Sequence, residues 1–477
     1  MLLGAVSVTG FAPLYAWPVP VVALAALFWL VRHAQPSHAF TLGWCYGLGL
    51  FGAGISWVYI SLSVYGGLPV LLAVLATLLF AAFLALYPAW ALWLAARLSA
   101  PGWGRMLLAL PASWVLSEWI RGWFLTGFPW LAVGYSQVPD GAFAGFAPVL
   151  GVYGVSLLLA VVAGCFARWH PRAMAIGVIL LCSGWGLLQV EWTRPVGQPV
   201  SVALLQGNVP QDMKFRPERL QTTLHGYAQQ MLSSQARLVI LPETALPLFR
   251  SSVPSDYLAL LARHARGQQG DVLLGLPEDL PSGEYFNSVI SLGSAAEGRY
   301  RKQHLVPFGE FVPWGFRWLV DMMHIPLGDF SRGGAQQPPL GAAGQKLAVN
   351  VCFEDVFGEE RIHAARQSSL LVNVSNDAWF GDSLAPWQHL QIGAMRSLEA
   401  GRWQLRANNT GVSAILDERG RVQAALPLFT SATLHGRAQG REGLTPYLRW
   451  GNGPVLFLIL GLLLAAALLS RQHRTSR

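Results

Sequence analysis

Charge is distributed very unevenly along this chain, and this distribution limits the folds that the chain can adopt. Residues 1–190 contain only eight charged side chains and no lysine, although the whole chain has 33 basic and 25 acidic residues. Charged residues make up 12% of the sequence, about half of the roughly 25% found in ordinary soluble proteins. The sequence therefore predicts an apolar first half inside a membrane and a polar domain outside it.

The apolar half and one C-terminal segment contain runs of the length that a membrane requires. A spanning helix needs about 20 mostly apolar residues, because the hydrocarbon core is about 30 Å thick. A single run of this kind is also compatible with a buried helix of a soluble protein, but so many runs in succession favour a multi-pass α-helical membrane domain with about eight spans. The expected spans are residues 1–13, 18–32, 40–61, 68–96, 105–124, 149–167, 173–190 and 454–470.

Arginine predicts the orientation of these spans, because short cytoplasmic loops carry an excess of positive residues. If the eight spans alternate, one side receives Arg32, Arg97, Arg105, Arg168, Arg172, Arg471, Arg474 and Arg477. We assign this side to the cytoplasm, with a cytoplasmic tail at 471–477. Residues 191–453 then face the periplasm of a bacterium. The net charge of +8 follows from this topology, and without a basic block we expect no nucleic-acid partner.

The polar segment 191–453 reads as a separate domain, in which short apolar runs alternate with helical patterns. This alternation is typical of an α/β layer fold. The expected strands are 200–206, 237–241, 271–276, 285–292, 346–352 and 370–375, and the expected helices are 217–234, 254–267 and 384–401. Glu243, Cys352, Asn376 and Asp377 come directly after such strands, where α/β folds gather their chemistry.

Cys352 differs from the other three cysteines, which lie in apolar runs, because it follows a strand of the polar domain. A cysteine nucleophile needs a base to take its proton and a cation or amide donors to stabilise the oxyanion. Glu243 fits the first role, with a pKa that burial can raise toward that of a general base. Lys302, one of only three lysines, fits the second. Taken singly, the three residues also fit a packed thiol, a helix cap and a surface charge.

Several motifs together resemble the nitrilase superfamily and, with the flanking spans, the apolipoprotein N-acyltransferase family. The superfamily resemblance comes from L-P-E-T at 241–244, the Lys302 segment and V-C-F-E-D at 351–355. The more specific stretches are H-L-V-P-F-G-E-F-V-P (304–313), N-D-A-W-F-G (376–381), P-W-Q-H (386–389), N-N-T-G (408–411) and G-L-T-P-Y (443–447). Together with motifs in the apolar half, these stretches extend the resemblance over nearly the whole chain.

The resemblance implies a nitrilase-like αββα sandwich for the polar domain and a role for each site residue. Glu243 would be the base, Lys302 the oxyanion stabiliser and Cys352 the nucleophile, while Glu310 and Glu354 would support them. The chain departs from the family pattern at Phe215, where tryptophan is frequent, and at Phe353, where tyrosine is frequent. Apolar stacking survives both changes, whereas the polar groups are lost.

The resemblance also implies a reaction in the bacterial inner membrane, the final step of lipoprotein maturation. An acyl chain would pass from the sn-1 position of a phospholipid to Cys352 as a thioester. It would then pass to the α-amino group of the diacylglyceryl-cysteine of an apolipoprotein, in a ping-pong sequence. No G-x-S-x-G, H-E-x-x-H, Walker or paired C-x-x-C motif is present, and we expect neither cofactor nor metal.

Two features of the sequence indicate how lipid reaches the site. Residues 314–326 are rich in aromatic and methionine side chains and predict a mobile hydrophobic arm, with ordinary packing as the alternative. Phe128, Trp130 and Tyr135 either line a route or anchor the interface. Glu118 and Arg121, one helical turn apart, either pair with each other or meet lipid headgroups.

Two other functions remain compatible with the residues alone. The first is a membrane-tethered nitrilase-type amidase, which uses the same three residues without lipid access. The second is a transporter or non-enzymatic scaffold, although the spans hold almost no ionisable residues to coordinate a polar substrate.

Overall fold

The computed structural model describes residues 1–312 and 329–475, and the predicted arm at 314–326 lies outside the described residues. The chain forms two compact units. The first consists of Met1–Tyr59, Pro69–Glu191 and Thr445–Arg477, and the second of Ile60–Leu68 and Trp192–Leu444.

The first unit is helical, and a helix lies within or across each of the eight segments predicted as spans. Its main helices are α1 (Leu2–Ser7), α2 (Pro18–Val31), α3 (Pro36–Gly54), α5 (Val70–Leu98), α6 (Leu110–Arg121), α7 (Ala147–Arg168), α8 (Pro171–Leu187) and α15 (Gly453–Thr475). Within the described residues, three helices are long and apolar enough to cross a membrane, at Val70–Leu98, Ala144–Arg168 and Gly453–Gln472. Pro36–Gly54 and Val58–Tyr65 form a bent pair that makes a fourth if it is one span.

Small residues allow α3 and α5 to approach each other closely. A Cβ atom added at Gly43 would lie 2.6 Å from the carbonyl oxygen of Pro88, and one at Gly47 would lie 2.7 Å from the Cα atom of Ala85. Glycines four residues apart share one face of a helix, which brings the two backbones into direct contact.

The second unit contains two six-stranded mixed sheets. The first sheet has the order β13 (Ala432–Ala438), β2 (Val200–Gln206), β3 (Leu238–Ile240), β4 (Asp271–Asp279), β5 (Tyr285–Gly293) and β6 (Gly298–Arg301). The second has the order β12 (Val422–Ala425), β11 (Ala414–Leu416), β10 (Gln404–Asn408), β9 (Leu370–Ser375), β8 (Gln345–Val351) and β7 (Leu340–Ala342). Strand β3 pairs in parallel with β2 and β4, and strand β9 pairs in parallel with β8 and β10. A short ribbon pairs β1 (Arg194–Pro195) with β14 (Arg441–Glu442).

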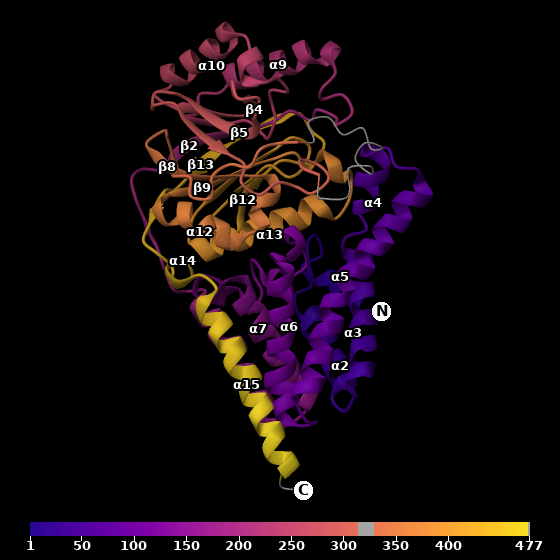
Figure 1. Cartoon of the computed structure of the whole chain (residues 1–477). Helices are drawn as coiled ribbons and strands as arrows, with labels where there is room; N and C mark the ends of the chain where they lie inside the picture. The colour runs from indigo at the N-terminus through magenta and orange to yellow at the C-terminus, as the bar shows by residue number, and fades with distance from the viewer. Residues whose placement is uncertain (313–328, 476–477) are drawn as a thin grey trace. The chain divides into compact units, whose positions relative to one another are not determined.

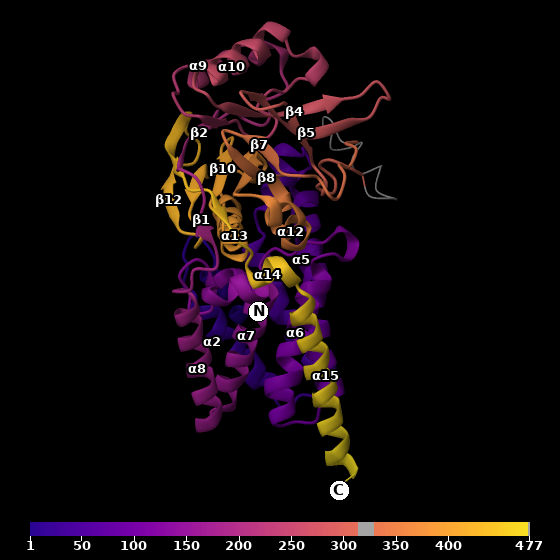
Figure 2. The ribbon, with the colours of Figure 1, turned by 90° about the vertical axis from the view of Figure 1, so that its left-hand side faces the viewer.

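The two sheets pack face to face, with helices on their outer faces (Figures 1 and 2). The core between the sheets combines Val202 and Leu204 of the first sheet with Val349, Val372 and Leu405 of the second. Helices α9 (Pro217–Leu232) and α10 (Ser255–Gly267) cover the first sheet, while α12 (Gly358–Gln367) and α13 (Ala385–Ala400) cover the second. The predicted αββα sandwich is therefore confirmed.

The short segment Ile60–Leu68 belongs to the second unit, although the sequence predicted a membrane span up to residue 61. Ser61 Oγ donates a hydrogen bond of 2.8 Å to the carbonyl oxygen of Trp379. The ring of Tyr65 meets the Trp379 ring edge to face, with centroids 6.2 Å apart. The apolar character of this segment is therefore used in packing against the loop after β9.

Leu405 tests the packing between the two sheets, because it is fully buried in their shared core. We expect Leu405→Ala to lower the free energy of unfolding by about 2–5 kcal/mol, since it leaves a cavity between two rigid sheets. Val422→Ala on β12, where the side chain is 47% exposed, is the matched control and should have little effect. Thermal unfolding in detergent measures both, and equal midpoints for the two variants would contradict this packing.

Candidate active site

Cys352 stands at a sharp turn directly after β8. Its backbone is left-handed, with φ of +53°, and a 3-10 turn spans Cys352–Val356. A non-glycine residue in this region costs roughly 1–3 kcal/mol and persists only where its surroundings hold it. The side chain is buried, with 8% of the residue exposed. The turn thus places a strained, buried thiol at the end of a strand, as the sequence predicted for its position.

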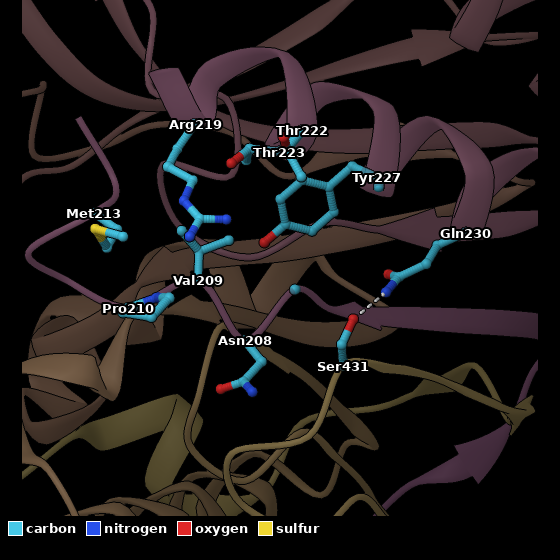
Figure 3. A pocket seen from close by; sticks show the side chains of 12 residues that line it. Asn208, Val209, Pro210, Met213, Arg219, Thr222, Thr223, Tyr227, Gln230 and Ser431 are labelled. Carbon is cyan, nitrogen blue, oxygen red and sulfur yellow. Dashed lines mark hydrogen bonds between the residues drawn. The ribbon is translucent and has the colours of Figure 1, made fainter. Parts of the chain in front are cut away.

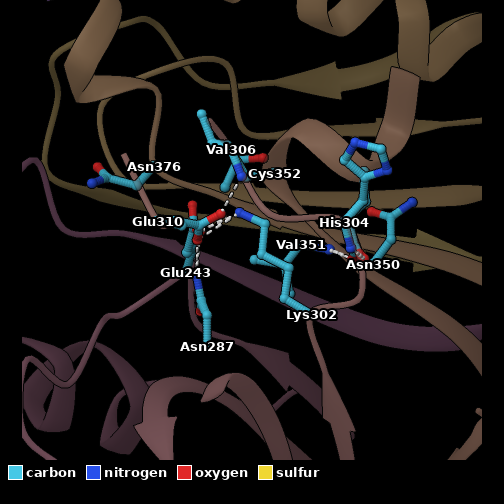
Figure 4. Close-up of polar contacts among 12 residues, drawn as sticks. Glu243, Asn287, Lys302, His304, Val306, Glu310, Asn350, Val351, Cys352 and Asn376 are labelled. Atoms are coloured by element: carbon cyan, nitrogen blue, oxygen red, sulfur yellow. Dashed lines mark hydrogen bonds and ion pairs between the residues drawn. The ribbon is translucent and has the colours of Figure 1, made fainter. Parts of the chain in front are cut away.

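Glu243 and Lys302 come from the ends of strands in the other sheet, and they meet. Glu243 follows β3, and Lys302 directly follows β6. The Lys302 Nζ atom lies 3.2 Å from Oε1 of Glu243 and 2.9 Å from Oε1 of Glu310. Figure 4 shows these three side chains converging beside Cys352. The structure therefore brings together the three predicted catalytic residues and Glu310.

Asn287 of β5 holds the two carboxylates in place. Its Nδ2 atom donates to Oε1 of Glu243 at 2.7 Å and to Oε1 of Glu310 at 2.8 Å. The second oxygen of Glu310 accepts from the backbone N–H of Val306 at 2.8 Å, which closes the loop after Lys302. The sequence analysis did not single out Asn287, because an asparagine inside a strand has no distinctive spacing.

Glu354 lies behind the turn and does not join this cluster. Its side chain is fully buried and accepts from the backbone N–H groups of Val351 at 2.8 Å, Gln303 at 2.8 Å and His304 at 3.1 Å. The Tyr300 hydroxyl donates to the same carboxylate. Glu354 therefore ties the chain beside Lys302 to the chain beside Cys352, and its supporting role in the reaction stays a prediction.

Burial and charge act on the site in opposite directions. Burial raises the pKa of the Cys352 thiol well above its ordinary value, the Glu243 charge raises it further, and the Lys302 ammonium lowers it. Burial lowers the pKa of Lys302, but the carboxylates of Glu243 and Glu310 outweigh this effect and hold it well above the ordinary value. Burial also raises the pKa of Glu310. At rest the thiol therefore keeps its proton while Lys302 stays charged, so a base must act during the reaction.

Lys214 is a site residue to which the sequence analysis assigned no role. Its buried Nζ atom donates a 3.1 Å hydrogen bond to the backbone carbonyl of Glu243. Burial lowers the pKa of Lys214 to about 8, although the charges of Glu243 and Cys352 act to raise it. The scarcity of lysine in the sequence was the signal that could have marked it.

Phe215 and Phe353, at which the chain departs from the family pattern, lie near the site. Phe215 follows Lys214 and is partly buried. Phe353 packs against the core between the sheets, and its ring meets that of Phe357 edge to face at 5.1 Å. Phe353 therefore keeps an apolar stacking role, as expected.

Glu118 and Arg121 lie on α6 in the first unit, where both are buried and bind the backbone of the segment that follows this helix. Arg121 Nη1 donates to the carbonyl oxygens of Phe128 and Trp130, at 2.5 Å each. Glu118 Oε1 accepts from the backbone N–H of Val133 at 2.9 Å. Trp130 and Tyr135 are each only 1% exposed. These contacts favour structural roles over headgroup binding or interface anchoring.

A cavity of about 350 Å³ lies between α9 and the loop after β2 (Figure 3). Its lining includes Asn208, Arg219, Tyr227 and Ser431, and excludes the residues around Cys352. Within the described parts of the chain, no group of three or more His, Cys, Asp or Glu side chains could hold a metal ion.

Comparisons with known proteins identify the family to which the chain is similar. A model of the apolipoprotein N-acyltransferase N-terminal domain matches residues 3–165, and a carbon-nitrogen hydrolase model matches residues 201–442. An apolipoprotein N-acyltransferase of Nitrosomonas europaea is 52% identical over 98% of this chain and 96% of its own length. One of Ralstonia nicotianae is 45% identical over 99% of this chain and 93% of its own. The solved structure of Saccharomyces cerevisiae Nit3, a nitrilase superfamily member, is 17% identical, with a TM-score of 0.38 over 51% of this chain and 91% of that one.

Lys214 predicts a pH dependence of stability. Its pKa is about 8 in the folded state and about 10.4 in an unfolded chain, so the unfolded state binds more protons between these values. Relative to Lys214→Met, the wild-type free energy of unfolding should therefore rise with pH in this window, by up to about 1.4 kcal/mol per pH unit. Below pH 8 both states are protonated, and the difference should be constant.

Thermal unfolding in detergent between pH 7 and pH 10 measures this difference. Lys346→Met is the control, because Lys346 is exposed and should show no such trend. A difference between wild type and Lys214→Met that stays constant above pH 8 would show that Lys214 keeps its ordinary titration.

Proposed function

The chain belongs to the apolipoprotein N-acyltransferase family, and from this membership we propose how its acyltransferase activity proceeds. The acyl donor is the sn-1 ester of a phospholipid. The acceptor is the α-amino group of the N-terminal diacylglyceryl-cysteine of an apolipoprotein. Between the two, the acyl chain is held as a thioester on Cys352.

In the first half-reaction, Glu243 takes the thiol proton and the Cys352 sulfur attacks the ester carbonyl. A C–S bond forms, the ester C–O bond breaks, and Glu243 returns the proton to the alkoxide, which leaves as lysophospholipid. Lys302 faces the oxyanion of the tetrahedral intermediate. The raised pKa of Cys352 supports the need for this base, since the thiol is protonated before substrate arrives.

In the second half-reaction, the acceptor amine attacks the thioester carbonyl. A C–N bond forms, the C–S bond breaks, and Glu243 moves the amine proton to the departing thiolate. The same carboxylate thus serves both halves, which balances protons over the cycle without a cofactor. Glu310 keeps Lys302 charged and in place through its 2.9 Å ion pair.

The proposal includes a place in the cell. About eight spans hold the enzyme in a bacterial inner membrane, with the catalytic domain facing the periplasm and the tail from residue 471 in the cytoplasm. The arginine distribution supports this orientation. The helices at the predicted segments support the spans.

One observation carries the proposal: the ammonium of Lys302 lies within 3.2 Å of the Glu243 carboxylate, beside a buried cysteine at the end of a strand. These three groups supply the base, the positive charge and the nucleophile that transfer of an acyl group through a thioester requires.

Mass spectrometry of the detergent-solubilised protein after incubation with phospholipid tests the proposal. We expect one acyl chain on the peptide that contains Cys352, and its release when a diacylated lipopeptide with a free α-amine is added. Cys352→Ala should lose the adduct completely. Cys182→Ala, which removes an exposed free cysteine, should keep it. An active enzyme without an adduct on Cys352 would overturn the mechanism.

A further inference from the structure

The proposed nucleophile depends on a backbone conformation that its own strand does not impose. Cys352 is left-handed, with φ of +53°, whereas Val351 before it is extended. The orientation of the peptide after Cys352 therefore determines where the thiol points. Groups that bind the carbonyl oxygen of Cys352 control this orientation.

Two buried side chains donate to that carbonyl oxygen. Nε2 of His389, on α13, lies 3.2 Å from it, and Nδ2 of Asn373, on β9, also lies 3.2 Å from it. A carbonyl oxygen can only accept, so Nε2 of His389 carries the hydrogen. His389 is 1% exposed and Asn373 is fully buried, so both contacts are shielded from bulk solvent.

The ring of His389 is itself held by a second contact. Its Nδ1 atom lies 3.0 Å from Oδ1 of Asp377, and Nδ2 of Asn408 donates to Oδ2 of the same carboxylate at 2.6 Å. A Cβ atom added at Gly411 would lie 2.6 Å from that oxygen, so the chain closes tightly over Asp377. Both oxygens of Asp377 are therefore engaged, and the imidazole has a fixed orientation.

These contacts also explain motifs that the proposed chemistry leaves without a role. N-D-A-W-F-G at 376–381 supplies Asp377, P-W-Q-H at 386–389 supplies His389, and N-N-T-G at 408–411 supplies Asn408 and Gly411. Three separate segments meet at one point behind the nucleophile.

We propose that His389 is a positioning residue for acylation of Cys352, and that Asp377 orients its ring. His389 acts through the Cys352 carbonyl and does not touch the reacting atoms. This inference rests on the proposed function, because it assumes that Cys352 receives the acyl chain.

Two amide substitutions at one position separate the two contacts of the ring. The amide nitrogen of His389→Gln lies near the place of Nε2 and can still donate to the Cys352 carbonyl. The shorter His389→Asn can still donate to Asp377 but does not reach the carbonyl. We expect acyl-enzyme formation within about threefold of wild type for the glutamine variant and at least about tenfold slower for the asparagine variant.

The measurement is the single-turnover rate of acyl-adduct formation on Cys352 over a range of phospholipid concentrations, with the thermal unfolding midpoint of each variant. For His389→Asn we expect a lower maximal rate with an unchanged half-saturating concentration. Equal rates for the two variants, or a wild-type rate for His389→Asn, would overturn the inference.

A second variant keeps the inference testable if His389→Asn does not fold. Asp377→Asn preserves shape but leaves either the His389 ring or the Asn408 amide without its acceptor, so acylation should slow several-fold. A wild-type rate for this variant would overturn the orienting role of Asp377. The absence of any adduct in the wild-type enzyme would overturn the proposed function itself, and the inference with it.

Discussion

One buried ammonium between two carboxylates is the interaction on which the site depends. Lys302 is 1% exposed, and Glu243 and Glu310 are nearly as inaccessible. Two buried carboxylates without a cation would repel each other and carry a desolvation cost of several kcal/mol per ion. The Lys302 ammonium offsets this repulsion through ion pairs of 3.2 Å to Glu243 and 2.9 Å to Glu310. The proposed transfer of the Cys352 proton to Glu243 depends on this ion triad.

The αββα sandwich brings these groups together through strand ends. Glu243 and Lys302 follow strands of the first sheet, and Cys352 follows a strand of the second. Packing of the two sheets turns residues distant in sequence into neighbours, and Glu354 links the two sides through three backbone N–H groups. A site built on strand ends and tied by buried hydrogen bonds is held more rigidly than one built on free loops.

The strands and helices of the polar domain could be predicted from the sequence wherever their buried residues are apolar. All six predicted strands and all three predicted helices of the polar domain are present, because runs such as V-S-V-A-L-L-Q at 200–206 are mostly apolar where they are buried. Strand β10 was missed, since its buried Gln404 and Arg406 read as polar. Both bond to Asp355, a partner that no local pattern reveals.

The site residues likewise divide into those that could be predicted from the sequence and those that could not. The proximity of Glu243, Lys302 and Cys352 could be predicted, because Glu243 and Cys352 follow expected strands and the order of the three residues resembles that of the nitrilase superfamily. Asn287, Lys214 and His389 could not be assigned roles, since each makes its site contacts with a distant segment. The inclusion of Ile60–Leu68 in the second unit was also missed, because an apolar segment that packs on a domain has the same composition as the end of a span.

The most direct test of this account is the free energy of unfolding of two variants. One carries Lys302→Met alone, and the other combines Lys302→Met with Glu310→Gln. Lys302→Met should lower the free energy of unfolding by about 3–5 kcal/mol, because it leaves two carboxylates buried without a cation. Adding Glu310→Gln removes one of these charges, so the double variant should be more stable than Lys302→Met. If the second substitution instead destabilises the Lys302→Met protein as much as it destabilises the wild type, the ammonium does not hold the carboxylates together and the account is wrong.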